Sequence, residues 1–134
     1  MKIFFDTNVL IAVFITRGAS NELFEHCISE HIIYISEQVV NEFRTNLAGK
    51  FHFSENEISH AVKFLRKNAV IVVPLPLSGR VSRDPDDDNI IAGAVAGKAD
   101  CLITGDWDIL ALKSFQGIPI LKPADFWKFE KERT

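Results

Sequence analysis

Short, continuously apolar segments alternate along the chain with segments of helical periodicity, and this alternation constrains the fold more than any other feature. The apolar segments predict five buried strands, at KIFF, IIYIS, AVIVVPLP, CLITG and IPIL. Strands without polar alternation are typical of parallel sheets that are covered on both faces. The sequence therefore predicts a three-layer α/β/α sandwich with a central, mainly parallel sheet of about five strands.

The segments between these strands carry apolar residues three and four positions apart, as amphipathic helices do. One of them opens with Ser54 and Glu57, which have the spacing of a capping box. The predicted helical segments are NELFEHCIS, EQVVNEFRTNL, SENEISHAVKFLRKN, the apolar part of 83–100, DWDILALKS and PADFWKFEK.

Length and composition set further bounds. The chain has 134 residues, which predicts a single domain over 1–134. No segment has the length of a membrane span, and the start lacks the long apolar stretch of a secretory signal, so we expect a cytoplasmic protein. Cys27 and Cys101 are expected to be buried thiols. No zinc site is expected, because no metal-ligand motif joins the four histidines, His26, His31, His52 and His60.

Aspartates stand where two of the predicted strands end. Asp6 directly follows the first strand, and Asp106 follows the fourth strand after two small residues. Ligands of parallel sheets bind beyond the carboxyl ends of the strands. We therefore expect both carboxylates at the same edge of the sheet, where chemistry should be sought.

The stretch RDPDDDNIIAGAVAGKAD (83–100) sets four aspartates directly before an apolar helical segment. Its predicted buried stripe consists of Ile90, Ile91, Ala94 and Val95. At about 100° per residue, Asp87 continues this stripe, while Asp86 and Asp88 fall toward its edges. Asp84 precedes Pro85 and is expected outside the helix. Asp87 should therefore point across the top of the sheet, toward the two aspartates that end strands.

Each acid taken alone also has a structural explanation. Aspartates such as Asp106 or Asp88 often cap helices, and Asp6 could form an Asx-turn. Glu42 lies at the border of the apolar stripe of its helix, where it could face solvent or reach inward. Capping does not require three aspartates to converge on one edge, however. Their convergence favours a functional site.

Carboxylates this close together cannot all stay ionised unless a cation joins them. Oxygen ligands without cysteine or histidine suit Mg²⁺ or Mn²⁺. Such ions support phosphodiester hydrolysis, because they activate water and stabilise the leaving oxygen. The net charge of −3 argues mildly against nucleic-acid binding, but the rest of the chain is slightly basic once four acids are neutralised. Candidate contacts to a nucleic-acid backbone are Arg17, Arg44, Lys50, Arg80 and Arg83.

The chain resembles the PIN domain family of metal-dependent ribonucleases, which includes VapC-type toxins of toxin–antitoxin pairs. The residues that carry this resemblance run in order along nearly the whole chain: DTNVLI, SEQVVNEF, DPDDDNIIAGAVAGKADCLITGD and PADF. The resemblance implies an RNA substrate and an acidic site of Asp6, Glu42, Asp87 and Asp106. Relatives often have Asp-Asp-Asn at the third position, so Asp88 competes with Asp87.

The resemblance also implies supporting residues and partners. Asp108 matches a further acid of the family, Thr7 and Asn8 would steady the first turn, and Thr104 the last one. Family members often form homodimers, and the toxins are neutralised by a small antitoxin protein. Glu42 would bind the metal or position the attacking water. The RNA target, the number of metal ions and the choice between toxin and housekeeping nuclease stay open.

Two alternatives belong to other classes. A receiver-type phosphoacceptor domain is also an α/β sheet of this size with acids at strand ends, but it needs an acidic pair after the first strand, where Asp6 stands alone. A catalytically silent PIN-like module that only binds RNA or protein would normally lack one or more of the four acids. The sequence therefore favours an active hydrolase.

Overall fold

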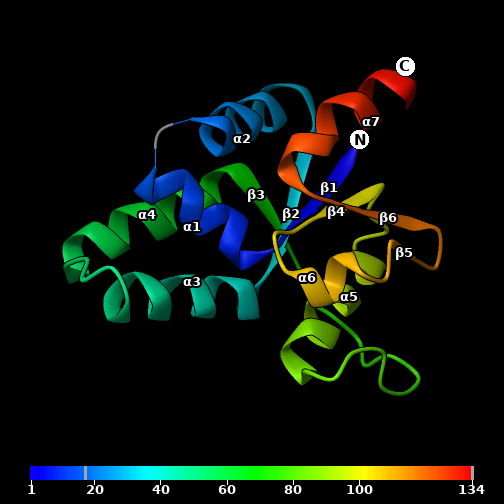
Figure 1. The fold of residues 1–134 in the computed structure, drawn as a ribbon. Coiled ribbons are helices and arrows are strands. Elements are labelled where there is room, and N and C mark those ends of the chain that lie inside the picture. Colours follow the sequence, from blue (N-terminus) through cyan, green and yellow to red (C-terminus); the bar gives the residue numbers. More distant parts are fainter. Residues whose placement is uncertain (17, 134) are drawn as a thin grey trace.

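The computed structural model of the protein describes residues 1–16 and 18–133, in which a six-stranded sheet lies between helices (Figure 1). The strands are β1 (Lys2–Phe5), β2 (Ile32–Ser36), β3 (Ala69–Val72), β4 (Cys101–Ile103), β5 (Ser114–Phe115) and β6 (Ile118–Leu121). The helices are α1 (Thr7–Ile15), α2 (Ala19–Glu30), α3 (Glu37–Gly49), α4 (Glu55–Asn68), α5 (Pro85–Ala96), α6 (Trp107–Leu110) and α7 (Phe126–Arg133), with a 3₁₀ turn at Pro123–Asp125.

The strand order is β3-β2-β1-β4-β6-β5, and every pair except β5 with β6 is parallel. The chain moves outward from β1 through β2 to β3 and then returns to β4 on the other side of β1. Parallel crossovers are almost always right-handed. As a result α1 to α4 lie on one side of the sheet, while α5 packs on the opposite face of β1, β2 and β4 (Figure 1). The predicted three-layer α/β/α sandwich is confirmed.

The change of direction around β1 has a consequence for ligand binding. A crevice forms beyond the carboxyl ends of the two strands that flank such a switch point. Here these strands are β1 and β4, which pair through Phe5 and Ile103. Asp6 follows β1 directly and Asp106 follows β4 after Thr104 and Gly105, so the topology places both aspartates at this crevice.

The core is built on the central strand. Ile3, Phe4 and Phe5 of β1 have no exposed surface, and Phe5 stacks edge-to-face with Phe24 of α2. The predicted burial of Cys27 and Cys101 is confirmed, and both are free thiols. No helix within the described ranges is long and apolar enough to span a membrane.

The structure corrects the sequence prediction after β4. The helix expected over DWDILALKS ends at Leu110, and a sixth strand, β5, follows it. Lys113 and Gln116 have positive φ angles of 63° and 49°, and Gly117 has 80°. This left-handed backbone cannot continue a helix, and it turns the chain so that Ser114–Phe115 pairs antiparallel with β6. The count of five strands was therefore too low by one short strand.

The starts of α4 and α5 agree with the sequence, whereas α1 (Thr7–Ile15) was not among the predicted helices. Ser54 and Glu57 form the predicted capping box of α4, with both reciprocal hydrogen bonds present. Asp84 lies outside α5 as expected and caps it, and Pro85 occupies the first turn.

Candidate functional site

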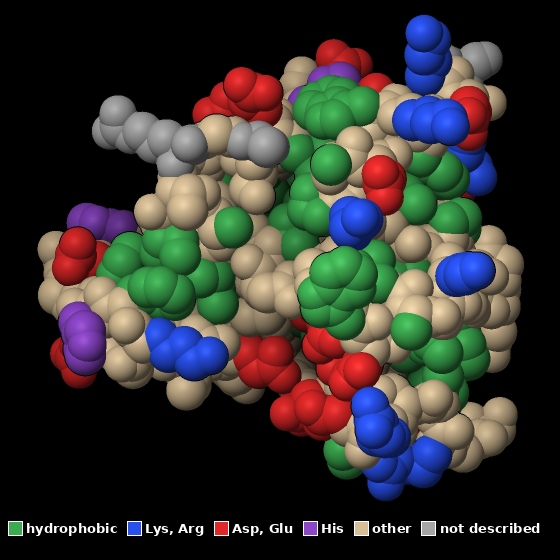
Figure 2. Space-filling view, viewed as in Figure 1, with side chains coloured by type: hydrophobic (Ala, Val, Ile, Leu, Met, Phe, Trp, Pro, Cys, Tyr) green, Lys and Arg blue, Asp and Glu red, His purple; other side chains and the backbone are tan. Residues whose placement is uncertain are grey.

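Four acidic side chains from separate parts of the sequence line one cleft of about 820 Å³. Asp6 follows β1, Glu42 lies in α3, Asp87 lies in the first turn of α5, and Asp106 follows β4. Figure 2 shows acidic side chains gathered near α3 and α6, with lysine or arginine side chains at either side. The structure thus brings all four predicted site residues to one place.

Asp6 is 6 % exposed, and hydrogen bonds fix both of its carboxylate oxygens. The Thr7 backbone N–H donates to Oδ1 at 2.6 Å, and the Thr104 hydroxyl donates to Oδ2 at 2.7 Å. The same Thr104 hydroxyl accepts a hydrogen bond from the Asp106 backbone N–H at 3.0 Å. Thr104 therefore holds the two strand-end aspartates in register with each other.

Glu42 turns toward the cleft instead of facing solvent. Its Oε2 accepts a hydrogen bond from the Thr7 hydroxyl at 2.9 Å, and its Oε1 accepts one from the Gln38 amide at 3.0 Å. Thr7 thus touches Asp6 through its backbone and Glu42 through its side chain. Gln38 was not singled out from the sequence, although its position one helical turn before Glu42 is a signal that could have found it.

The neighbouring aspartates Asp87 and Asp88 have different surroundings. Asp87 is 7 % exposed and lines the cleft, where its Oδ2 accepts a hydrogen bond from the Ser82 hydroxyl at 3.3 Å. Asp88 faces the loop before α5 and accepts hydrogen bonds from the backbone N–H groups of Val81, at 3.2 Å, and Ser82, at 2.6 Å. The geometry therefore favours Asp87 as the third acid of the cleft.

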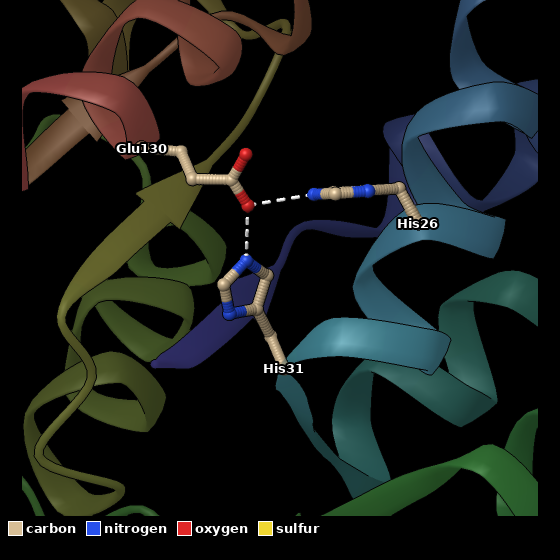
Figure 3. Close-up of side chains that lie close together, drawn as sticks. All are labelled: His26, His31 and Glu130. Atoms are coloured by element: carbon tan, nitrogen blue, oxygen red, sulfur yellow. Dashed lines mark hydrogen bonds and ion pairs between the residues drawn. The ribbon is translucent and has the colours of Figure 1, made fainter. Parts of the chain in front are cut away.

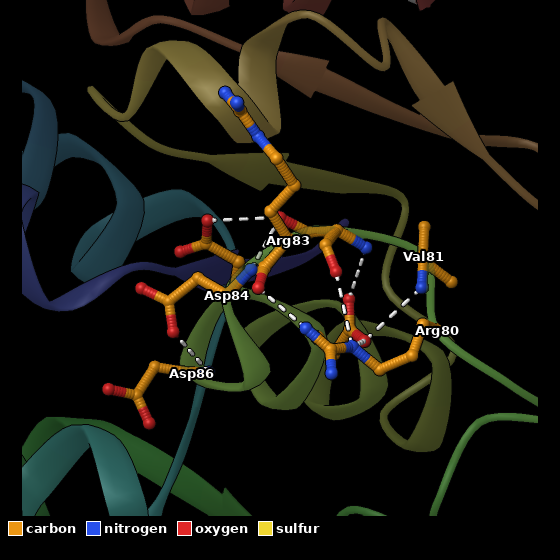
Figure 4. Close-up of polar contacts among 8 residues, drawn as sticks. Arg80, Val81, Arg83, Asp84 and Asp86 are labelled. Atoms are coloured by element: carbon orange, nitrogen blue, oxygen red, sulfur yellow. Dashed lines mark hydrogen bonds and ion pairs between the residues drawn. The ribbon is translucent and has the colours of Figure 1, made fainter.

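The other two aspartates of this stretch also have separate roles. Asp84 accepts a hydrogen bond from the Asp86 backbone N–H at 2.9 Å, which caps α5 (Figure 4). Asp86 is exposed at the rim of the cleft, with its Oδ1 3.5 Å from the Gln38 amide nitrogen. The four aspartates of this stretch thus have four different positions. Asp84 caps α5, Asp86 lies at the rim of the cleft, Asp87 lines the cleft, and Asp88 binds the loop before α5.

The environment of the cleft disfavours ionisation of two acids. Burial raises the pKa of the Asp6 carboxyl to about 6, and the charges of Glu42 and Asp106 add to this effect, against the hydrogen bonds from Thr104 and Thr7. Burial and the charge of Asp106 raise the pKa of the Asp87 carboxyl to about 6 as well. Among the described residues, no lysine or arginine forms an ion pair with either carboxylate.

The donor atoms fit a hard divalent cation. Asp87, Asp106 and Asp108 each offer one carboxylate oxygen, and these oxygens lie within 4.8 Å of one another. Asp6 and Glu42 line the cleft together with Asp87 and Asp106 but do not belong to this closest group. No cysteine or histidine lines the described part of the cleft, and oxygen ligands alone suit Mg²⁺ or Mn²⁺.

The candidate basic residues are spread more widely. Lys50 lines the cleft, and the Arg83 guanidinium lies 3.5 Å from Asp108 with its side chain 91 % exposed. Arg80 turns toward Asp88 and donates to the Arg83 carbonyl oxygen at 2.5 Å (Figure 4). Arg44 lines a separate surface hollow beside α4. Arg17 lies outside the described residues.

The fold and the site together define a class of protein. Its members are three-layer α/β/α domains with an acidic site beyond the carboxyl ends of the central strands. Within this class, the chain belongs to the PIN domain family, because the sequence profile of that family matches residues 2–108. The matched range contains all four predicted acids. Family membership confirms the resemblance and displaces the receiver-domain alternative.

Two solved structures have the same fold as this chain. VapBC2 from Rickettsia felis, bound to a DNA fragment from its promoter, matches with a TM-score of 0.67 and 14 % identity over 91 % of this chain and 98 % of that chain. VapBC-1 from nontypeable Haemophilus influenzae matches with a TM-score of 0.66 and 16 % identity over 92 % and 99 %. At such identities the likeness shows the fold. No curated protein sequence matches.

Proposed function

We propose that this protein is a divalent-metal-dependent endoribonuclease, and that it is the toxin of a toxin–antitoxin pair. The single observation that carries the proposal is the convergence of four carboxylates in one cleft, two of them buried without a described cationic partner. Buried carboxylates are costly unless a cation neutralises them. The fold brings these carboxylates together in spite of the free-energy cost of burying them, and this supports a metal-binding role for the cleft.

Asp87, Asp106 and Asp108 offer the closest oxygens for Mg²⁺ or Mn²⁺, and Asp6 stands beside them. When bound, the ion supplies charge compensation and lowers the pKa of a water molecule that attacks phosphorus. The protein's own residues do the remaining work. Thr104 orients Asp6, and Glu42, held by Thr7 and Gln38, is available to position the water or to add a further ligand.

The substrate and partner rest on the family and on its complexes. The cleft has Lys50 at one side and Arg83 close to Asp108, which supports contact with a phosphate backbone. The two solved neighbours are VapBC complexes, so a small antitoxin that covers the acidic cleft is the partner we propose. Formation of a homodimer and action on RNA in the cytoplasm belong to the same proposal.

Cleavage of RNA by matched variants tests the site. Asp87→Asn keeps the size of the side chain and removes its charge, so it should abolish cleavage in Mg²⁺ or Mn²⁺. Asp125→Asn changes an exposed aspartate that does not line the cleft, so it is the control and should cleave like the wild-type protein. Asp88→Asn should retain cleavage where the loop still folds. Full activity of Asp87→Asn, or activity unaffected by a chelator, would refute the assignment.

Toxicity requires a test in cells. Expression of the wild-type protein should stop growth, and the Asp87→Asn variant should not. Growth inhibition by both proteins, or by neither, would count against a toxin that acts through this cleft.

A further inference from the structure

A second group of ligand-type side chains lies at the end of the sheet opposite the acidic cleft. His26 is in α2, His31 directly follows α2 and precedes β2, and Glu130 is in α7. The Nε2 atoms of both histidines point at the same carboxylate oxygen, Oε2 of Glu130 (Figure 3). The distance from His26 Nε2 is 2.6 Å, and His31 makes a short contact of the same kind. Two segments about a hundred residues apart thus meet at one oxygen atom.

This cluster is sheltered but reachable from solvent. The side chains of His31, Glu130 and His26 are 10 %, 20 % and 28 % exposed. The Phe126 ring lies 5.7 Å from the His31 ring, and the Trp127 ring lies 4.7 Å from the His26 ring. Aromatic walls therefore limit the mobility of the imidazoles, while an ion could still enter.

Glu130 supplies a negative charge to the cluster, and the N-terminal ammonium group lies 3.1 Å from Nδ1 of His31, on the other side of the ring from the proposed ligand atom Nε2. Partial burial opposes ionisation of Glu130, but hydrogen bonds from His26 and His31 outweigh it and lower the pKa of this carboxyl. Glu130 therefore carries its negative charge at neutral pH. Two imidazole nitrogens and one carboxylate oxygen make up a ligand set that suits Zn²⁺ and similar transition metals better than Mg²⁺.

The geometry needs only a small adjustment to hold an ion. The three ligand atoms lie within 4.8 Å of one another. Around tetrahedral Zn²⁺, with bonds of about 2.0–2.2 Å, neighbouring ligand atoms stand about 3.3–3.5 Å apart. Glu130, whose side chain is 20 % exposed, would have to withdraw from the histidines by about 1 Å to bind an ion together with them.

We propose that His26, His31 and Glu130 form a transition-metal site that takes Zn²⁺ and ties α7 to α2. The site has three protein ligands and leaves a fourth position for water or another ligand. It is separate from the acidic cleft in place and in chemistry, and it does not rest on the proposed ribonuclease activity. The absence of a zinc motif in the sequence does not exclude it, because the histidines flank a helix end and the third ligand comes from the far end of the chain.

Zinc binding by the whole protein tests this proposal. Titration calorimetry with Zn²⁺ in a buffer that contains excess Mg²⁺ should show one equivalent of zinc bound at this cluster, and zinc should raise the melting temperature. His26→Gln and Glu130→Gln should each weaken binding at least about tenfold. His60→Gln changes an exposed histidine of α4 outside the cluster and should bind like the wild-type protein.

A fluorescence measurement shows where the ion binds. The chain has two tryptophans, so Trp127 is the only one left in a Trp107→Phe variant. Co²⁺ in place of Zn²⁺ should quench the fluorescence of Trp127 in this variant, and the further change His26→Gln should remove the quenching. If the wild-type protein binds no zinc, or if His26→Gln binds it as tightly, the cluster is only a set of hydrogen bonds that fasten α7. RNA cleavage plays no part in either readout, so failure here leaves the proposed function untouched.

Discussion

At the scale of single residues, the cleft is defined by carboxylates whose ionisation the fold disfavours. Asp6 and Asp87 have pKa values raised to about 6, mainly by burial. An acid whose pKa is higher in the folded state than in the unfolded state stabilises the fold fully below its unfolded pKa. This contribution is lost as the pH rises through the folded value. For both groups the loss falls between about pH 4 and pH 6.

Asp87→Asn should remove the contribution of Asp87 to this pH dependence, and leave that of Asp6, in protein kept free of divalent metal. Relative to wild type, the variant should gain stability as the pH rises from 4 to 7.5, by at most about 3 kcal/mol. Urea unfolding at several pH values measures the difference, with the exposed Asp86→Asn as the control. Added Mg²⁺ should stabilise the wild-type protein and leave Asp87→Asn unchanged. Parallel pH profiles for the variant and the wild type would contradict the assignment.

Substitutions of Thr104 test whether the orientation of Asp6 and Asp106 affects metal binding and RNA cleavage. The buried hydroxyl of Thr104 joins the Asp6 carboxylate to the backbone of Asp106. Thr104→Val keeps the shape and removes the hydroxyl, so we expect Mn²⁺ affinity and RNA cleavage to fall by about 10–100-fold. Thr104→Ser retains the hydroxyl and should recover most of both. A valine variant with unchanged Mn²⁺ affinity would show that the hydroxyl serves only the fold.

At the scale of elements, the position of Asp87 depends on how closely α5 approaches β1. A Cβ atom added at Gly93 would lie 2.6 Å from Cζ of Phe4, which is fully buried. Gly93→Ala should therefore destabilise the protein by about 1–3 kcal/mol, partly offset by better helix propensity. Gly49→Ala, at the end of α3, meets open space and should be neutral or stabilising. Equal stability of the two variants in urea would show that α5 can shift away from the sheet.

The sequence predicts those parts of the site that follow from local periodicity. The 3.6-residue repeat of α5 predicts the inward position of Asp87, and the ends of two apolar strands predict Asp6 and Asp106. The direction of Glu42 could not be predicted, because it depends on a hydroxyl of α1. The short strand β5 depends on left-handed residues at Lys113 and Gln116, which periodicity does not reveal. The histidine cluster depends on contacts across the whole chain.

At the scale of the whole molecule, the two ends of the parallel sheet carry different groups of side chains. The carboxyl edge of the sheet carries the acidic cleft, with Arg83 at its rim. The amino edge carries His31 beside the first residue of β2. A net charge of −3 argues against RNA binding only while the acids of the cleft stay unneutralised. Binding of RNA should therefore depend on the few basic residues at the carboxyl edge, and on salt.

Arg83→Ala should weaken the binding of a single-stranded RNA, measured in an Asp87→Asn background that does not cut it. If the arginine binds one phosphate, its removal should make the slope of log K against log salt shallower by about 0.7. The Arg83–Asp108 pair is largely exposed, so its removal should hardly affect stability. Lys67→Ala changes an exposed lysine at the end of α4, just before β3 and so at the amino edge, and should leave affinity and slope unchanged. Equal effects of the two substitutions would mean that RNA is attracted by overall charge alone and that the rim of the cleft does not guide it.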